Sequence, residues 1–219
     1  MGRPREFDEE QVLDAVTDAF WAKGYEGTST RDLVAATGLT QPSLYNAFGD
    51  KRVLFRRALD HYLDRTLRHK IARMEAELPP AAAITAFFEE IIGRSLSDDK
   101  QRGCLLVNST LEATCDDVEL RQAVASELRQ LRSFFMRCIT AAQRNSEIKA
   151  TVSPDDAASN LLAVALGLRI LARVDPKPEL FTGAVAQAMA MLGLSAPTAL
   201  KIRRHRSQNR PMPSCSQTG

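Results

Sequence analysis

The sequence predicts an all-α protein in which a small N-terminal helix-turn-helix unit precedes a larger helical domain. Apolar residues recur at intervals of three and four along most of the chain, which is the spacing of one face of a helix. No segment shows the sustained alternation of apolar and polar residues that is typical of a strand. Glycine and proline separate the helical segments, so we expect domains at 1–50 and 51–194 and a basic, disordered tail at 195–219.

The first helix has clear start and stop signals. Asp8 is expected to cap its N-terminus, because a carboxylate there accepts hydrogen bonds from the free N–H groups of the first turn. Gly24 is expected to end it. The residues between them form an apolar stripe that we expect to face the core: Val12, Ala15, Val16, Ala19 and Phe20.

Two short helices are expected next, at 30–37 and 41–48. Ser29 and Asp32 have the spacing of a capping box at the start of the first, and Thr40 is placed to cap the second. A tight turn that contains glycine joins them. This is the pattern of a helix-turn-helix, which places its second helix in the major groove of DNA.

The outer face of the second short helix carries polar side chains that are suited to reading bases. Gln and Asn pair bidentately with adenine, and Ser and Thr contact several base edges. The candidates for base contact are Thr40, Gln41, Ser43 and Asn46. Other residues are placed to contact phosphates, and a short basic arm can enter the minor groove; these are Thr30, Arg31, Tyr45 and Lys51, with Arg3 and Arg5 in the arm.

The run TSTRDLVAATGLTQPSLYNAFGDKRVLFRRAL resembles the DNA-binding signature of TetR-family repressors. The resemblance is strong over about residues 7–60 and weak beyond them. It implies a three-helix DNA-binding head, a connecting fourth helix and a ligand-binding body of five or six helices. It also implies a homodimer that represses transcription from palindromic, double-stranded operator DNA until a small-molecule inducer binds.

Position by position, the same resemblance implies roles for the residues already singled out. It places the base contacts at the start of the second short helix, on Thr40, Gln41 and Ser43. It places the backbone contacts on Thr30, Arg31, Tyr45 and Lys51. Asn46 departs from the aromatic residue or histidine that is often found at its position.

Asp50 is expected to cap a long fourth helix whose apolar positions continue to Leu78, where Pro79 and Pro80 interrupt the chain. Five further helices are expected at 82–96, 104–114, 117–146, 154–174 and 178–192. The last two are apolar on most faces and contain small residues that permit close packing, so we expect them to form the interface of a homodimer. The alternative is that they complete the core of one subunit.

The larger domain is expected to bind its ligand in an apolar cavity that holds a few polar groups. The candidate residues are Cys104, Asn108, Leu111, Phe134, Phe135, Cys138 and Arg169. Plainer interpretations stay open beside these. Asn108 suits a buried amide bonded to the backbone, and the two phenylalanines suit an ordinary core. Arg169 suits either a carboxylate at the dimer interface or an anionic effector.

Cys104 supports a second hypothesis for the function. It follows Arg102 and Gly103 at the expected N-terminus of a helix, where the helix dipole and the arginine favour a reactive thiolate. Some relatives that resemble this chain around GCLLVN use a cysteine there to sense electrophiles or oxidants. The alternative function is therefore a thiol-based sensing repressor, and the plain alternative is a cysteine that packs as a small hydrophobe.

The composition also bears on other classes of protein, such as enzymes and membrane proteins. The 219 residues carry a net charge of +2, four cysteines and three histidines, without metal-ligand spacing, a Ser/His/Asp arrangement or a phosphate-binding loop. We therefore expect no metal, no cofactor and no catalysis, and the balanced charge argues against a general DNA-packaging protein. No run approaches about 18 apolar residues, and the N-terminus lacks a signal-peptide core, so we expect no membrane span and a cytoplasmic location.

Overall fold

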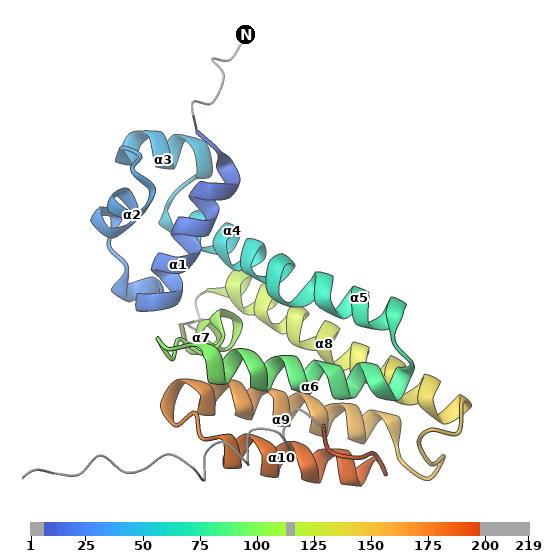
Figure 1. Ribbon diagram of the computed structural model, residues 1–219. Helices are drawn as coiled ribbons and strands as arrows, with labels where there is room; N and C mark the ends of the chain where they lie inside the picture. Colours follow the sequence, from blue (N-terminus) through green and yellow to red (C-terminus); the bar gives the residue numbers. More distant parts are fainter. Residues whose placement is uncertain (1–6, 113–116, 198–219) are drawn as a thin grey trace, which may run out of the picture.

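The computed structural model describes residues 7–112 and 117–197 of the chain. Within these ranges the chain forms helices and no strand, which confirms the all-α prediction. Figure 1 shows a small head at one end of a layered helical body. The head consists of α1 (Glu9–Gly27), α2 (Thr30–Thr37) and α3 (Gln41–Phe48). The predicted arm and most of the predicted tail lie outside the described residues.

A long connecting helix runs from the head along the body (Figure 1). It consists of α4 (Lys51–Leu63), a π-helical turn η1 (Asp64–Arg68) and α5 (His69–Glu77). The body is completed by α6 (Pro80–Ser97), α7 (Leu105–Glu112), α8 (Val118–Arg144), α9 (Pro154–Val174) and α10 (Pro178–Met191). In Figure 1 the helices α5, α8, α6, α9 and α10 lie roughly side by side, with α9 and α10 at the face farthest from the connecting helix.

The starts of the head helices are set by neighbouring residues, as the sequence predicts. The Asp8 carboxylate accepts hydrogen bonds from the backbone N–H groups of Glu10 and Gln11 at 2.9 and 3.4 Å. Ser29 and Asp32 form a complete capping box, in which each side chain accepts a hydrogen bond from the other residue's backbone N–H. These contacts satisfy donors that a helix N-terminus would otherwise leave free.

The predicted end of α1 is wrong by about one turn. Gly24 interrupts the helix at φ 76°, but a further helical turn continues to Gly27. The body holds this turn, because the backbone N–H of Tyr25 donates to the carboxylate of Glu112 at 2.8 Å. A contact between residues 87 positions apart cannot be read from local stop signals.

The connecting helix is continuous to Glu77, as predicted, but it contains the unpredicted π-helical turn η1. A π turn holds an extra residue, which widens the helix and weakens its regular hydrogen bonding. The body makes contacts that support this turn. The carbonyl of Thr66 accepts from Arg94 at 3.4 Å, and Arg68 pairs with the buried carboxylate of Glu127 at 2.6 Å.

Two apolar cores hold the molecule together. The body core joins the connecting helix to α6, α8, α9 and α10. It contains a cluster of four phenylalanine rings with centroids 5.1 to 5.8 Å apart: Phe87, Phe88, Phe134 and Phe135. The second core unites α1, α2, α3 and α4, and it also includes Leu105 and Leu106 of α7 with Leu120 and Val124 of α8. The head is thus packed directly against part of the body.

Candidate DNA interface and effector cavity

Helix α3 presents a polar surface to solvent and an apolar surface to the head. Leu44 and Phe48 are buried, whereas Gln41, Ser43 and Asn46 are exposed. The Thr40 hydroxyl accepts a hydrogen bond from the Ser43 backbone N–H at 3.3 Å and donates to the Ser43 hydroxyl at 2.9 Å. The face that the sequence predicts to read bases is therefore available to solvent and lies at a well-capped helix start.

The residues predicted to contact the DNA backbone lie on α2, on α3 and at the start of α4. The hydroxyls of Thr30 and Tyr45 form a hydrogen bond of 2.8 Å that links the start of α2 to α3. The Lys51 ammonium lies 4.5 Å from the ring centroid of Tyr25, and Arg31 is exposed. Arg3 and Arg5, the predicted arm residues, lie outside the described residues.

A cavity lies between the connecting helix and α6, α7, α8 and α9. The cavity itself has a volume of about 50 Å³. The total empty space between its walls, including the part that is open to solvent, is about 590 Å³. Most of its wall is apolar, including Leu63, Leu67, Met74, Phe87, Ile91, Leu106, Val107 and Leu131. Its polar groups are few: Tyr62, Cys104, Arg94, Arg169, Thr66 and the ion pair between Lys70 and Glu90. This is the composition typical of a small-molecule site.

The cavity contains a contact between Tyr62 and Cys104. The Tyr62 hydroxyl donates to the Cys104 sulfur at 3.6 Å. Burial raises the pKa of Tyr62 well above its usual value, and the neighbouring Cys104 adds to this, so the phenol stays protonated as a donor at neutral pH. Cys138 differs, because it lies in the body core, where burial raises the pKa of its thiol to about 12. Cys138 is thus an inert packing residue.

The structure brings only two of the predicted effector residues to this cavity, Cys104 and Arg169. The Asn108 amide donates to the backbone carbonyl of Arg102 at 3.0 Å, as expected if its role is to bond the backbone rather than a ligand. Leu111 is 89% exposed. The other three are buried in the body core and are not among the residues that line the cavity: Phe134, Phe135 and Cys138.

Sequence reasoning missed Tyr62, Arg94 and the π-helical turn as parts of the cavity wall. Tyr62 falls on the apolar stripe of the connecting helix, and nothing local distinguishes a cavity-lining tyrosine from a core tyrosine. Arg94 did carry a signal, since it is the one charged residue in the last two turns of α6. The π turn had none that we recognise.

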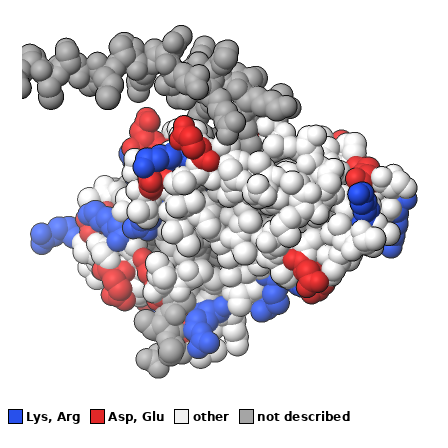
Figure 2. Space-filling model, turned by 90° about the horizontal axis from the view of Figure 1, so that it is seen from below, with Lys and Arg blue, Asp and Glu red and all other residues white. Residues whose placement is uncertain are grey.

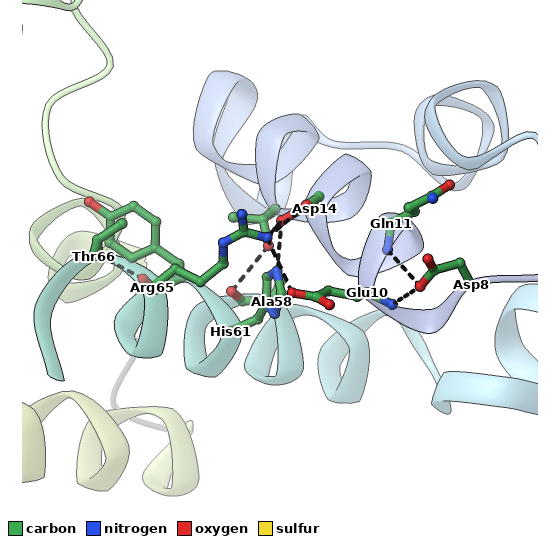
Figure 3. A network of polar contacts seen from close by, with 10 residues as sticks. Asp8, Glu10, Gln11, Asp14, Ala58, His61, Arg65 and Thr66 are labelled. Atoms are coloured by element: carbon green, nitrogen blue, oxygen red, sulfur yellow. Dashed lines mark hydrogen bonds and ion pairs between the residues drawn. The ribbon is translucent and has the colours of Figure 1, made fainter. Parts of the chain in front are cut away.

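Head and connecting helix are also joined by a polar network, shown in Figure 3. The Asp14 carboxylate on α1 contacts His61 at 2.7 Å and Arg65 at 2.7 Å, and Thr17 donates to the carbonyl of Ala58 at 3.2 Å. Burial opposes ionisation of Asp14, but the His61 hydrogen bond and the Arg65 charge outweigh it and lower the pKa of Asp14. These contacts fix α1 on the connecting helix.

Comparison with known families agrees with this architecture. Residues 12–58 match the model of the bacterial regulatory proteins of the tetR family, and residues 80–188 match that of the tetracyclin repressor-like C-terminal domain. The transcriptional repressor ComR of Escherichia coli is 31% identical over 173 residues, which cover 78% of this chain and 82% of ComR. The chain belongs to the TetR family of transcriptional regulators.

Other relatives of this TetR-family regulator agree with it over most of the chain. The regulator YezE of Bacillus subtilis is 31% identical over 175 residues, which cover 80% of this chain and 90% of YezE. Among solved structures, the TetR regulator CifR, as a cysteine mutant complexed with a 26-base-pair operator, superposes with a TM-score of 0.74. It is 30% identical, and the match covers 87% of this chain and 98% of CifR.

Helix α9 is long and apolar enough by length and composition to cross a membrane, and it is the one such helix in the described part of the chain. The sequence prediction of no span relied on uninterrupted apolar runs, which α9 lacks because polar and charged residues, including Asn160 and Arg169, interrupt it. Core helices of soluble proteins pass the same test. The family of DNA-binding regulators to which the chain belongs supports that interpretation.

Proposed function

We propose that this TetR-family regulator is a cytoplasmic homodimeric repressor that leaves a palindromic operator when a small molecule enters the cavity. One observation carries the proposal: the cavity is lined by Tyr62, Leu63, Thr66 and Leu67, which belong to the same continuous helix that packs against α1. The wall of the effector site and the support of the DNA-binding head are therefore one element. We retain the expected domains of 1–50 and 51–194, with a tail at 195–219, as part of the proposal.

Helices α9 and α10 support the proposed dimer. Their inward residues, including Phe181, Val185 and Met189, complete the core of one subunit. Their outward faces keep large apolar side chains exposed: Ile170, Val174, Leu180 and Met191. Figure 2, which looks at the molecule from the α9 and α10 side, shows a broad face without charge between charged edges. Such a face is typical of an isologous subunit interface.

The small size of the cavity suggests how the ligand acts. A volume of about 50 Å³ is less than a drug-sized ligand needs, so binding has to separate the connecting helix from α6 and α9. A ligand that binds only the widened form shifts the population toward it. Coupling of about 1–3 kcal/mol, or roughly 5–150-fold in operator affinity, is typical of such systems.

We also propose distinct roles for the head residues. Gln41 and its neighbours Thr40, Ser43 and Asn46 read bases, whereas Tyr45, Thr30, Arg31 and Lys51 contact the backbone. Gln41→Ala should lose about 1–3 kcal/mol and relax base preference at one position. Tyr45→Phe should weaken binding to all DNA sequences alike, by about 1 kcal/mol. Fluorescence anisotropy on systematically mutated operators separates the two, with the exposed Gln122→Ala on α8 as the control.

The first experiment measures binding of the protein to the DNA upstream of its own gene, with and without a panel of small apolar compounds. Loss of operator binding with a compound that binds the protein supports the proposal. No tight binding to any upstream sequence would contradict it. Sedimentation of Ile170→Asp tests the dimer, and Val118→Asp is matched to it because both wild-type residues are 54% exposed. Only the first should yield monomers.

The thiol-based alternative rests on one observation, which is that the Cys104 sulfur is part of the cavity wall. An electrophile that enters the cavity would alkylate this sulfur and add bulk between the same helices. Treatment with N-ethylmaleimide should then release wild type from DNA and leave Cys104→Ser bound. Release of both proteins, or of neither, would argue for a cysteine that only packs.

A further inference from the structure

A second cavity adjoins the first, at the place where the head meets the body. It is bordered by Trp21 of α1, by the last turns of α6, by the loop before α7 and by α9. Its volume is about 290 Å³, and the space between its walls is about 680 Å³ with the open part counted. Arg94 and Arg169 line both cavities, so the two cavities adjoin at these side chains, and we treat them as the apolar end and the polar end of one combined site.

The polar end contains two buried groups that lack partners. The Ser95 hydroxyl and the Trp21 indole N–H make no hydrogen bond within the described structure, and Ser95 is only 4% exposed. Buried polar groups are nearly always hydrogen-bonded, because an unmet donor forfeits its bonds to water. The indole N–H can only donate and the hydroxyl can donate, so a ligand with acceptor oxygens satisfies both groups.

The combined site carries a net positive charge. Four basic and two acidic side chains line it: Lys70, Arg94, Arg102 and Arg169 against Glu90 and Asp98. Lys70 pairs with Glu90 and Arg102 with Asp98. Of the remaining two, Arg94 donates only to a backbone carbonyl at 3.4 Å, and Arg169 has no hydrogen bond or ion pair in the part of the chain that the structure describes. Two guanidinium groups are thus left without a carboxylate.

We propose that the effector is an organic carboxylate with an apolar body, which occupies both cavities at once. Its carboxylate lies between Arg94 and Arg169, which suit the fork geometry of a carboxylate, and accepts from the Ser95 hydroxyl. Its apolar part enters the first cavity and widens it. This inference rests on the proposed function and specifies the chemical class of the inducer.

The polar end also offers a direct link to the head. Arg102 stacks over the Trp21 ring at 3.8 Å and pairs with Asp18 of α1 at 3.0 Å. A carboxylate in this cavity competes with Asp18 for Arg102. Binding therefore weakens one of the contacts that fix α1 on the body, at the same time as the apolar part displaces the connecting helix.

The experiment uses the full chain without DNA. Trp21 is the single tryptophan and lines the site, so its fluorescence reports binding directly. Octanoate, decanoate and 4-phenylbutyrate are each titrated beside the neutral primary amide of the same skeleton. We expect each carboxylate that binds to do so on the order of 10-fold to 100-fold more tightly than its amide, because charge-assisted hydrogen bonds are lost in the amide.

Arg169→Gln and Arg94→Gln should each reduce this preference to less than about threefold. Arg173→Gln is the matched control, because Arg173 lies on α9 one turn from Arg169, is exposed and does not line the site. Circular dichroism checks that every variant is folded. If Arg169→Gln fails to fold, Arg94→Gln and Ser95→Ala carry the test.

The outcomes separate this inference from the proposed function. Equal binding of acids and amides, or no binding of any acid, overturns the carboxylate assignment, even if another compound releases the operator. A carboxylate preference that survives both arginine substitutions overturns the placement. Each carboxylate that binds is then tested in a separate operator-binding measurement. A carboxylate that binds through Arg169 but leaves operator affinity unchanged supports the site and contradicts the proposed repressor mechanism.

Discussion

The head and the body of this regulator are built in different ways. In the head, helix starts are fixed by residues two or three positions apart, as in the capping box of Ser29 and Asp32. In the body, the cavity joins residues from Tyr62 to Arg169, and its Tyr62–Cys104 contact links residues 42 positions apart. The difference implies that the head is a preformed reading surface, whereas ligand response depends on how long helices fit together.

The largest effect is expected in the body core. Phe135→Ala removes a fully buried ring from the phenylalanine cluster and should lower the free energy of unfolding by about 3–5 kcal/mol. Below the melting temperature, operator affinity should change little, because the head surface is built locally. Urea unfolding and anisotropy on the same protein test both points. A matching loss of operator affinity at low temperature would show that the head is not independent of the body core.

A smaller effect is expected at the joint between the two regions. Gly24 has φ 76° and ψ 174°, a conformation that essentially only glycine adopts. Gly24→Ala should cost about 1–3 kcal/mol and disturb the contact of Tyr25 with Glu112. Thermal melts should show the loss, with Gly27→Ala as the control, because a Cβ added there would make only an ordinary contact with Lys23 at 3.6 Å. Equal melting of the two variants would contradict the role given to Gly24.

Within the head, the cap of α2 can be removed by one substitution. Ser29→Ala deletes the hydroxyl that accepts from the Asp32 N–H at 3.2 Å and should destabilise the fold by about 0.5–2 kcal/mol. Operator affinity should fall as well, because Thr30 and Arg31 occupy the first turn of α2. The ligand concentration that releases half of the operator should stay the same. A shifted ligand midpoint would mean that the head contributes to ligand response.

The smallest effect is expected for the exposed network of Figure 3. Asp14→Asn removes partners of His61 and Arg65 and should cost at most about 1 kcal/mol, since exposed ion pairs contribute little. The pKa of Asp14 is lowered by folding, so its contribution is present above pH 3.8 and is lost as the pH falls below that value. Unfolding of both proteins at pH 7 and pH 3 should show a larger difference in the free energy of unfolding at pH 7 than at pH 3.

Much of the fold and of the proposed DNA-binding face could be predicted from the sequence. The caps, the turn glycines and the apolar periodicity of the head depend on residues that are close in the chain, and these signals indicated α2 and α3 at their observed bounds. The effector site could be predicted only in small part. Periodicity identifies which face of a helix is buried, but it does not distinguish the packed core of Phe134 from the cavity wall at Tyr62.

By itself, the sequence determined that the chain is helical, where most helices begin and end, and which polar side chains α3 exposes. These follow from hydrogen bonds and spacings within one or two turns. Only the tertiary structure decided where α1 ends, that the connecting helix contains a π turn, and that Arg94, Arg169 and Ser95 meet beside Trp21. Each of these depends on contacts between distant segments, where packing of several helices, rather than local propensity, sets the outcome.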